Sequence, residues 1–341
     1  MPHTLVTGAN SFVAAHIISA LLSQGHTVTG SVRRHSAGTA ILASNPSWAG
    51  KLDFVEIKDY ASPGIWDEVF KFKEFDYIVH VAAPLLDNPA NVDYDEHYLR
   101  PSVEGNLSLL RSANTYAPTL KAIAMTGSIN ALTTGDDLPA RVLTHESWNN
   151  ITPDAARAAN HPYISYCSSK KEAELAVWEF VKTEKPSFTV TVFLPALIFG
   201  PPIQPVKDAK SLNFSAGIFY SLFSGENAGK PVPGTMFPSY VDVRDLADAH
   251  IKALTTPAAT NKRYLIGGSP YSNTAAVRVL ADRFPQLRSR LPVGDEENVI
   301  VATIEADECS EALAVTFRTF EETVIDMTNK ILEIENWSCV G

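Results

Sequence analysis

The chain has 341 residues, 45% of them hydrophobic, and carries a formal net charge of −10 from 38 acidic and 28 basic residues. That length can bury about three quarters of the unfolded surface, as one large domain or two interleaved ones. The acidic balance, without any basic run, argues against nucleic acid or an anionic membrane as a partner.

The two ends of the chain and its cysteines indicate a compartment. An apolar strand starts close to Met1, and no run of about 18 apolar residues occurs, so we expect neither a signal peptide nor a membrane span. Cys167, Cys309 and Cys339 are far apart and odd in number, which predicts neither a disulfide framework nor a zinc site. These features favour a cytoplasmic protein.

Apolar strands alternate with helical stretches through the first 200 residues. Such alternation is typical of a parallel sheet with crossover helices on both faces. We therefore predict an α/β fold, a Rossmann-type doubly wound parallel sheet with a smaller, interleaved C-terminal substrate lobe. The predicted strands are 3–7, 27–32, 52–57, 76–82, 120–126 and 188–194, and the predicted helices are 11–24, 64–72, 92–114 and 163–183.

The loop after the first strand has small residues at the spacing used for a pyrophosphate. Gly8 permits a tight turn, a small residue at position 11 lets a phosphate approach the backbone, and Ala14 lets the helix pack on its strand. Ser11 stands where the strict pattern has glycine. A strand-to-helix turn that binds no phosphate therefore remains nearly as good an interpretation of this loop alone.

The second predicted strand ends in Arg33 and Arg34 rather than in an acidic residue. An acid at this point accepts from the ribose 2′-hydroxyl of NAD, whereas an arginine suits a 2′-phosphate. A solvated basic pair at a strand end is the alternative. The alternating strands and helices favour the phosphate interpretation.

Tyr166 and Lys170 stand four residues apart, and Ser128 ends an apolar strand upstream. Positions i and i+4 share a helix face, so the phenol and the ammonium would point into the same space. Attraction between a phenolate and an ammonium ~5 Å apart is roughly 3 kcal/mol at an effective dielectric of about 20. We therefore expect Lys170 to lower the pKa of Tyr166 from its usual value near 10. An ordinary half-exposed helix face is the alternative.

Beyond Gly200 the composition changes, because several prolines break the chain into loops around one helical piece at 212–224. The segment 240–255 returns to the sheet. We predict a nucleotide-binding domain formed by 1–200 plus 240–268, and a substrate-binding lobe formed by 201–239 plus 269–341.

Together these motifs resemble the extended short-chain dehydrogenase/reductase superfamily, in its branch of fungal aldehyde and ketone (methylglyoxal-type) reductases and plant dihydroflavonol reductases. The resemblance covers roughly residues 3–270. The segments that carry it, in order, are 6–14, 31–33, 76–84, 101–106, 125–128, 166–170, 195–201 and 240–245.

The resemblance implies reduction of aldehyde or ketone carbonyls to alcohols by NADPH, with a small carbonyl compound as partner and a monomer or homodimer as assembly. It implies that Ser128 holds the carbonyl oxygen, that Tyr166 is the general acid, and that Lys170 activates Tyr166 and binds the nicotinamide ribose. Asp59 and Tyr60 would touch adenine, and Pro195 and Ala196 would flank the nicotinamide. The implied cofactor-binding residues are Gly8, Asn10, Ser11, Phe12, Val13, Arg33, Asp59, Tyr60, Val81, Ala82, Ala83, Thr126, Tyr166, Lys170, Pro195, Ala196 and Ile198.

An apolar pocket is expected for the substrate, and no metal. Its predicted lining is Leu85, Ser128, Ile129, Phe199, Ile218, Phe219 and Met236.

The chain departs from the pattern of the superfamily at Gly127, which replaces a serine or threonine, and at Ser102, which replaces an asparagine of a proton relay. Two other functions stay open. One is a sugar-nucleotide epimerase or dehydratase on the same fold, which usually carries an acid after the second strand. The other is a non-catalytic NADP-sensing regulator, which typically lacks the Tyr166 and Lys170 pair. His80 and His161 are interpreted as packing and turn residues.

Overall fold

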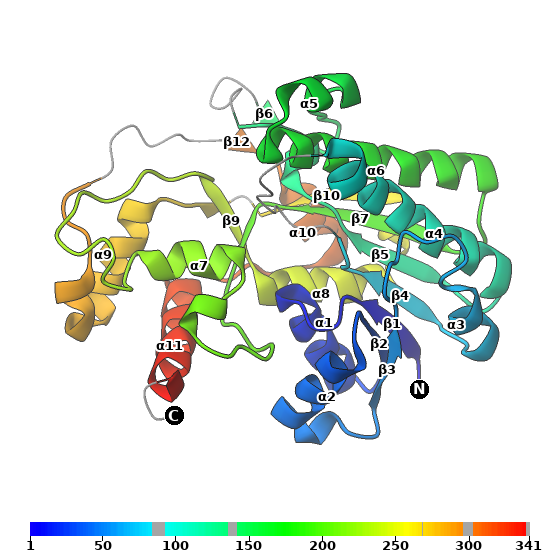
Figure 1. The fold of residues 1–341 in the computed structure, drawn as a ribbon, viewed down its shortest axis with the longest axis horizontal. Helices are drawn as coiled ribbons and strands as arrows, with labels where there is room; N and C mark the ends of the chain where they lie inside the picture. Colours follow the sequence, from blue (N-terminus) through cyan, green and yellow to red (C-terminus); the bar gives the residue numbers. More distant parts are fainter. Residues whose placement is uncertain (84–92, 136–141, 268, 296–302, 339–341) are drawn as a thin grey trace.

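The computed structural model describes residues 1–83, 93–135, 142–267, 269–295 and 303–338. Seven parallel strands form one central sheet in the order β3-β2-β1-β4-β5-β7-β10 (Figure 1). The strand order reverses between β1 and β4, which is where such sheets bind their ligands. The doubly wound α/β prediction is confirmed. The strands are β1 (His3–Thr7), β2 (Thr27–Val32), β3 (Leu52–Glu56), β4 (Tyr77–His80), β5 (Ala122–Thr126), β7 (Thr189–Pro195) and β10 (Lys262–Ile266).

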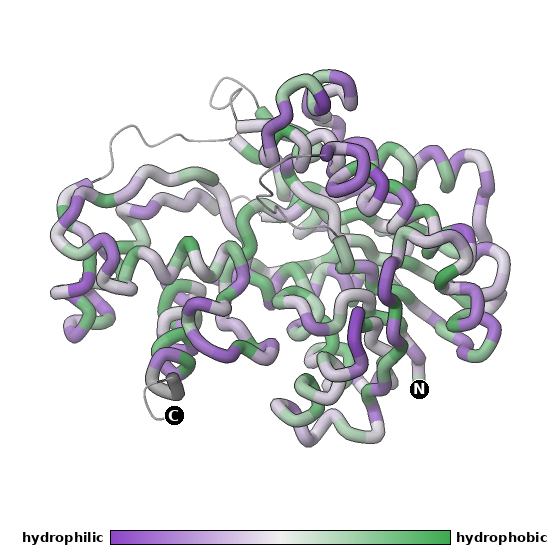
Figure 2. The backbone as a smooth tube through the Cα atoms, viewed as in Figure 1, coloured by the Kyte–Doolittle hydropathy of each residue, from purple (hydrophilic) through white to green (hydrophobic). Residues whose placement is uncertain are grey.

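Helices cover both faces of this sheet (Figure 1). On one face α4 packs against α3 and α6, and on the other α1 packs against α8. Figure 2 shows hydrophobic residues concentrated along the inner strands and the helix sides that meet them. Among the described residues, no helix combines the length and apolar character needed to cross a membrane. The bounds are α1 (Phe12–Ser23), α3 (Asp67–Phe72), α4 (Arg100–Tyr116), α6 (Pro162–Glu184) and α8 (Val243–Ala253).

The strands and helices predicted for the first 200 residues are confirmed, with ends shifted by a few residues. Two α-helices were missed, α5 (Pro153–Ala159) and α2 (His35–Ser44), of which α2 follows the two arginines. Its sequence has no clear apolar stripe and contains Gly38, which lowers helix propensity. Tertiary packing explains the helix, because a Cβ on Gly38 would lie only 2.7 Å from the ring of Phe54 on β3. Only glycine lets the helix approach β3 so closely.

A second lobe lies beside the sheet, on the left of Figure 1. It has its own core, in which Phe199, Phe219 and Tyr271 are fully buried and in contact. The predicted helix at 212–224 is present as α7. The elements of this lobe are the three-stranded sheet of β8 (Leu197–Phe199), β9 (Ser239–Asp242) and β11 (Ser269–Pro270), with α7 (Phe214–Ser221), α9 (Asn273–Arg283) and α11 (Phe320–Ser338).

The segment 303–317 packs with the large sheet, although 269–341 was expected to belong to the substrate lobe. It contains β12 (Thr303–Ile304), which pairs with β6 (Val142–Leu143), and α10 (Asp307–Leu313). Cys309, Leu313 and Val315 are buried in the same core as α1 and α8. The apolar side of α10 therefore decides its location, and the sequence offered no sign of which core it would join.

A buried ion pair joins α6 to the edge strand β10. The guanidinium of Arg263 donates to both carboxylate oxygens of Glu174, at 2.7 and 2.9 Å, and these side chains are only 11% and 3% exposed. Arg263 also donates to the Ser147 carbonyl oxygen at 3.0 Å and lies 3.8 Å from the centroid of the Trp148 ring. One arginine thus holds α6, β10 and the loop before α5 (Pro153–Ala159) together.

We predict that Arg263→Ala lowers the free energy of unfolding by about 3 kcal/mol or more, since Glu174 would stay buried without its partner. Urea denaturation followed by circular dichroism measures the change. Arg278→Ala is the matched control, because Arg278 pairs with Asp295 at 2.8 Å on the surface, where both side chains are mostly exposed. An exposed ion pair contributes little to the free energy of unfolding. Equal losses of the free energy of unfolding in the two variants would contradict the stabilising role of the ion pair between Arg263 and Glu174.

Three buried histidines bridge separate elements by hydrogen bonds. His16 on α1 bonds the Pro201 carbonyl oxygen, His80 on β4 bonds Thr7 and Asn106, and His250 on α8 bonds Thr126, all at 2.8 to 3.0 Å. Burial lowers the pKa of His16, His80 and His250 from 6.5 to about 4. All three are therefore neutral in the folded protein near pH 7. The prediction that His80 is a packing residue agrees with this position.

A lowered histidine pKa makes the protein less stable in acid. The unfolded chain takes up protons below about pH 6.5, and the folded chain does so only near pH 4. We predict that the contribution of these histidines to the free energy of unfolding is fully present above pH 6.5. This contribution falls towards pH 4, by about 1.4 kcal/mol per pH unit for each such histidine. Denaturation at several pH values tests this. His80→Gln should reduce the slope, and the exposed His35→Gln should not.

Candidate active site

The carboxyl ends of β1 and β4 meet in very close contact. Gly8, directly after β1, has φ +66°, and a Cβ there would lie 3.2 Å from the Cα of Ala82. The hydroxyl of Thr7 accepts from the backbone N–H groups of Val81 and Ala82, both at 3.0 Å. Thr7 therefore donates its own hydrogen to Nδ1 of His80, 2.9 Å away. The switch point predicted to hold a pyrophosphate is thus a fixed backbone turn.

The first helix begins at this turn with its backbone N–H groups directed towards the edge of the sheet. Ser11 is the N-cap of α1, and its hydroxyl accepts from the N–H of Ala14 at 3.4 Å. Serine therefore serves here as a helix cap in place of the expected glycine. Asn10 is exposed, whereas the side chains of Phe12 and Val13 are buried in the core. Any contact of Phe12 or Val13 with a phosphate would be through the backbone.

Arg33 and Tyr60 lie together beyond the ends of β2 and β3. The exposed Arg33 hydrogen-bonds the phenol of Tyr60. Burial raises the pKa of Tyr60 to about 12, with Arg33 acting against the shift. The Tyr60 ring packs against Gly105 of α4, where a Cβ would come within 2.5 Å of it. Asp59 accepts from Ala61 N and Ser62 Oγ at 3.0 Å. The predicted adenine and 2′-phosphate residues thus share one corner of the sheet.

Ser128, Tyr166 and Lys170 form a cluster between the end of β5 and α6. Ser128 hydrogen-bonds Tyr166. Nζ of Lys170 lies 5.3 Å from the centroid of the Tyr166 ring, as expected from their spacing on α6. Ser128 and Lys170 are 8% and 9% exposed. The structure therefore brings the three predicted catalytic residues together.

The expected lowering of the Tyr166 pKa is not seen in this structure. Burial raises the pKa of Tyr166 to about 12. Burial also lowers the pKa of Lys170 to about 8. The sequence argument counted the attraction between two charges but not the cost of removing each charge from water. That cost dominates here, so Tyr166 is a neutral phenol near pH 7.

Close packing explains why glycine precedes Ser128. A Cβ on Gly127 would lie 2.9 Å from Leu194 and 3.0 Å from the Phe193 carbonyl oxygen on β7. The hydroxyl of the neighbouring Thr126 donates to Nε2 of His250 at 2.8 Å. Nε2 must be the acceptor, because Nδ1 of His250 carries the ring hydrogen and donates it to the Leu246 carbonyl oxygen. The predicted cofactor residue Thr126 therefore uses its side chain within the fold.

A small cavity of about 30 Å³ lies behind Lys170, between β5, α4 and α6. It is lined by the predicted residues Ala82, Ala83, Thr126 and Lys170, and also by Ser102 and Asn106. The Oγ atom of Ser102 is buried and has no hydrogen-bond partner among the described residues. Ser102, which stands where the superfamily has the asparagine of a proton relay, therefore lies close to Lys170.

At the end of β7 the chain turns towards the lobe. Ala196 is 8% exposed, and a Cβ on Gly267 would lie 3.1 Å from the Cβ of Ala196. Pro195 ends β7, and Ile198 belongs to β8. These residues lie where the sheet and the lobe join.

The predicted substrate residues are only partly brought together. Ile129 and Ile218 are partly buried, and Met236 is 69% exposed. Phe199 and Phe219 are each 1% exposed in the lobe core, so the structure does not place them on an open pocket wall. Their burial follows from mutual ring contacts at 5.8 Å between centroids. Leu85 lies outside the described residues.

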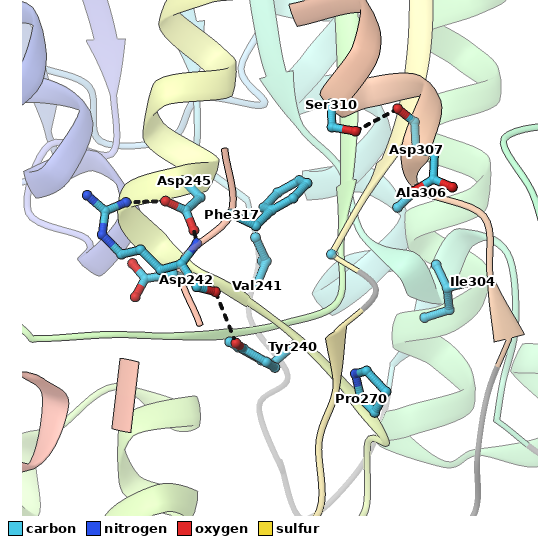
Figure 3. Close-up of a pocket in the computed structure, with 12 residues that line it drawn as sticks. Tyr240, Val241, Asp242, Asp245, Pro270, Ile304, Ala306, Asp307, Ser310 and Phe317 are labelled. Atoms are coloured by element: carbon cyan, nitrogen blue, oxygen red, sulfur yellow. Dashed lines mark hydrogen bonds and ion pairs between the residues drawn. The ribbon is translucent and has the colours of Figure 1, made fainter. Parts of the chain in front are cut away.

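A larger cavity, of about 290 Å³, lies elsewhere, between β9, α8 and α10. Figure 3 shows Asp242 and Asp245 on one side of it and Ser310 and Asp307 on the other. Arg318 forms an ion pair with Asp245, whose pKa is raised by burial. None of the residues that line this cavity was predicted as a site residue. Ser128, Tyr166 and Lys170 do not line this cavity either, so it is separate from the cluster that they form.

Sequence reasoning missed two polar residues of the site, Thr7 and Asn130. Thr7 fixes the ends of β1 and β4, and the signal was a threonine directly before Gly8. Asn130 accepts from the hydroxyl of Ser128 at 3.3 Å and is 7% exposed. A buried asparagine two residues after a candidate catalytic serine could have indicated this contact.

Relatives and solved structures match nearly the whole chain. The ketoreductase azaE of Aspergillus niger is 31% identical over 96% of this chain and 97% of its own length. The NADPH-dependent methylglyoxal reductase GRE2 of Saccharomyces cerevisiae is 29% identical, with 97% of this chain and 98% of the relative covered. The structure of yeast methylglyoxal/isovaleraldehyde reductase Gre2 complexed with NADPH matches with a TM-score of 0.87 and 28% identity over 98% of this chain and 99% of that chain.

More distant structures share the fold. Vestitone reductase from alfalfa matches with a TM-score of 0.76 at 21% identity, over 98% of this chain and 99% of that chain. The model of the NAD dependent epimerase/dehydratase family matches residues 4–267, which include every predicted catalytic and cofactor-binding residue. The chain therefore belongs to the NAD dependent epimerase/dehydratase family, the extended short-chain dehydrogenases/reductases that its motifs resemble.

Proposed function

We propose that the protein is an NADPH-dependent reductase that converts aldehyde or ketone carbonyls to alcohols. The observation that carries this proposal is the contact between Ser128, Tyr166 and Lys170 at the carboxyl edge of the sheet. Relatives matched over their full length, named ketoreductase and NADPH-dependent methylglyoxal reductase, support it.

The residues at the switch point fit a dinucleotide. Gly8 has no Cβ, so the ends of β1 and β4 approach closely beside Ala82 and the chain makes the tight turn into α1 that a pyrophosphate site needs. Ser11 caps α1, whose N-terminal N–H groups favour an anion. Arg33 is exposed next to Tyr60, with no ion pair to a carboxylate among the described residues, and can bind a 2′-phosphate. The bound NADPH supplies the hydride that goes to the carbonyl carbon.

Tyr166 acts as the proton donor. A general acid must be protonated before the reaction, and burial keeps the pKa of Tyr166 well above neutral pH. Its hydroxyl gives a proton to the carbonyl oxygen as negative charge develops there. Lys170 stabilises the resulting phenolate, because its ammonium lies beside the ring. The cavity next to Lys170 has room for one water molecule. This water would link Lys170 to Ser102 and would help to return a proton to the Tyr166 and Lys170 pair.

The lining of the cleft favours apolar substrates. The loop before β9 crosses to α6, where the ring of Phe237 lies 6.5 Å from that of Tyr163. Met236 precedes Phe237 in this loop and is 69% exposed, and Ile129 precedes Asn130, which bonds Tyr163. Burial of apolar surface contributes about 25 cal/mol per Å², whereas burial of an unpaired diphosphate is costly. We therefore propose aryl or alkyl aldehydes, diketones and ketoesters as substrates, rather than nucleotide sugars.

We predict that NADPH is preferred over NADH by roughly 10- to 150-fold in kcat/KM, as a charge-assisted contact of about 1.5–3 kcal/mol would give. Steady-state kinetics with both cofactors measures the ratio. Arg33→Ala should remove most of it, and Arg34→Ala, which deletes the adjacent exposed arginine, is the control. An unchanged preference in Arg33→Ala would remove Arg33 from the site.

The function itself is tested by the absorbance of NADPH in the presence of a panel of carbonyl compounds and of UDP- and GDP-sugars. We expect consumption of NADPH with methylglyoxal and other aldehydes, diketones or ketoesters. Tyr166→Phe keeps the ring and deletes the acid, so kcat should fall at least about 100-fold while NADPH still binds. Conversion of nucleotide sugars without net NADPH consumption would favour an epimerase. Tight binding without any turnover would favour a sensor.

A further inference from the structure

The hydroxyl of Ser128 is bound on two sides by one neighbour, Asn130. Ser128 Oγ donates to Oδ1 of Asn130 at 3.3 Å and accepts from the backbone N–H of Asn130 at 3.2 Å. Both residues are more than 90% buried. Asn130 lies in the short helical turn Ile129–Ala131, and Ser128 is the N-cap residue of this turn. Asn130 therefore competes with any substrate for the hydrogen of Ser128.

The orientation of the Asn130 amide follows from a series of hydrogen bonds in which each donor and each acceptor can be assigned. The hydroxyl of Tyr163 lies 3.0 Å from the carbonyl oxygen of Thr134, which can only accept, so Tyr163 donates. Tyr163 then accepts from Nδ2 of Asn130, 2.9 Å away. With Nδ2 fixed on Tyr163, the Oδ1 of Asn130 faces Ser128. Oδ1 carries no hydrogen, so Ser128 must donate.

The turn that carries Asn130 is held firmly against α6. Nδ2 of Asn149 donates to the Asn130 carbonyl oxygen at 2.7 Å and to the Cys167 carbonyl oxygen at 3.0 Å. The backbone N–H of Asn149 donates to the Ala131 carbonyl oxygen at 2.9 Å. These bonds connect the turn to the residue next to Tyr166. The direction of the Ser128 hydrogen is therefore built into the packing of β5 on α6.

We propose that Asn130 is a positioning residue that turns the hydroxyl hydrogen of Ser128 away from Tyr166 until a carbonyl oxygen takes it. This inference rests on the proposed reductase function. In the free protein Ser128 can only accept from the Tyr166 hydroxyl, since its own hydrogen is on Asn130. Substrate binding then exchanges the Ser128–Asn130 bond for a bond to the carbonyl oxygen. At 3.3 Å the surrendered bond is long and weak, so the exchange is favourable.

The strength of the Ser128–Asn130 bond should therefore control the KM for the carbonyl substrate, and two substitutions should move it in opposite directions. Asn130→Asp gives Ser128 a charged acceptor, which holds the hydrogen more strongly and opposes charge on the carbonyl oxygen. Near pH 7 we expect KM to rise and kcat/KM to fall about 10-fold or more. Tyr163→Phe leaves the Asn130 amide held only by the weak bond from Nδ2 to Cys167 Sγ at 3.5 Å, so KM should fall about 2- to 5-fold with a smaller change in kcat.

The pH profile separates this role from structural damage. A protonated carboxyl at position 130 can donate to Tyr163 and accept from Ser128, as the amide does. The kcat/KM of Asn130→Asp should therefore recover as the pH falls, relative to the wild-type profile. Among the described residues, the titratable groups that contact Asn130 are Tyr163 and Cys167 of α6, while Tyr166 contacts Ser128 and Lys170 lies beside Tyr166; all four are common to both proteins. A uniform loss at every pH would overturn the proposal.

Tyr264→Phe is the matched control for Tyr163→Phe. Tyr264 is a buried tyrosine on β10 that donates to the Ala258 carbonyl oxygen at 2.8 Å, away from the cluster. Its removal should leave both kcat and KM unchanged. If Tyr163→Phe raises KM or leaves it unchanged, or if Tyr264→Phe lowers it equally, the inference is wrong. Thermal unfolding of each variant shows whether the fold is retained.

A readout that needs no turnover uses the wild-type protein. Neutron diffraction from deuterated crystals locates the deuterium of Ser128 directly. We expect it between Ser128 Oγ and Asn130 Oδ1, with the deuterium of Tyr163 on the Thr134 carbonyl oxygen. Deuterium directed from Ser128 to Tyr166 would overturn the inference, whether or not the protein reduces carbonyls. Absence of carbonyl reduction in the wild type, with the expected deuterium position, would instead refute the proposed function.

Discussion

The site depends above all on the close approach between the ends of β1 and β4. Gly8 turns with a positive φ, and its missing Cβ lets the backbone of Ala82 come near. Thr7 then satisfies two backbone N–H groups of the next loop with a single hydroxyl, and its bond to His80 leads on to Asn106 of α4. Every hydrogen-bonding group in this series is used, so the switch point is rigid. A rigid backbone is what a dinucleotide site requires.

Burial decides the electrostatics of the cluster that faces this turn. The pKa of Tyr166 is raised and that of Lys170 is lowered by the same cause, the loss of water around each charge. A low dielectric also strengthens the interaction between neighbouring charges and any charge that forms during a reaction. In the proposed reaction, this environment would keep the phenol protonated until negative charge develops on the substrate oxygen, and the nearby ammonium would then stabilise the phenolate.

The second lobe is fixed to the sheet by polar contacts as well as by its own core. Asp242 caps α8, bonds Arg244 at 2.7 to 2.9 Å, and accepts from Thr323 of α11 at 2.8 Å. Arg244 also pairs with Asp326 of α11. A segment near the end of the chain is thereby tied to the helix that follows β9. This explains how an interleaved lobe keeps a defined position relative to Tyr166.

The sequence alone determined the parallel sheet, most of its helices and the pairing of Tyr166 with Lys170, because strand periodicity and the i, i+4 spacing on α6 are local properties. Ser128 was added to this pair by the resemblance to a family. Tertiary structure decided what depends on contacts between distant segments. The close contact of Gly38 with Phe54 fixed α2 against β3, and the apolar side of α10 joined the large core. The side chains of Phe199 and Phe219 became buried in the core of the second lobe. The pKa of Tyr166 and the role of Asn130 were decided in the same way, since burial and hydrogen-bond direction depend on neighbours far along the chain.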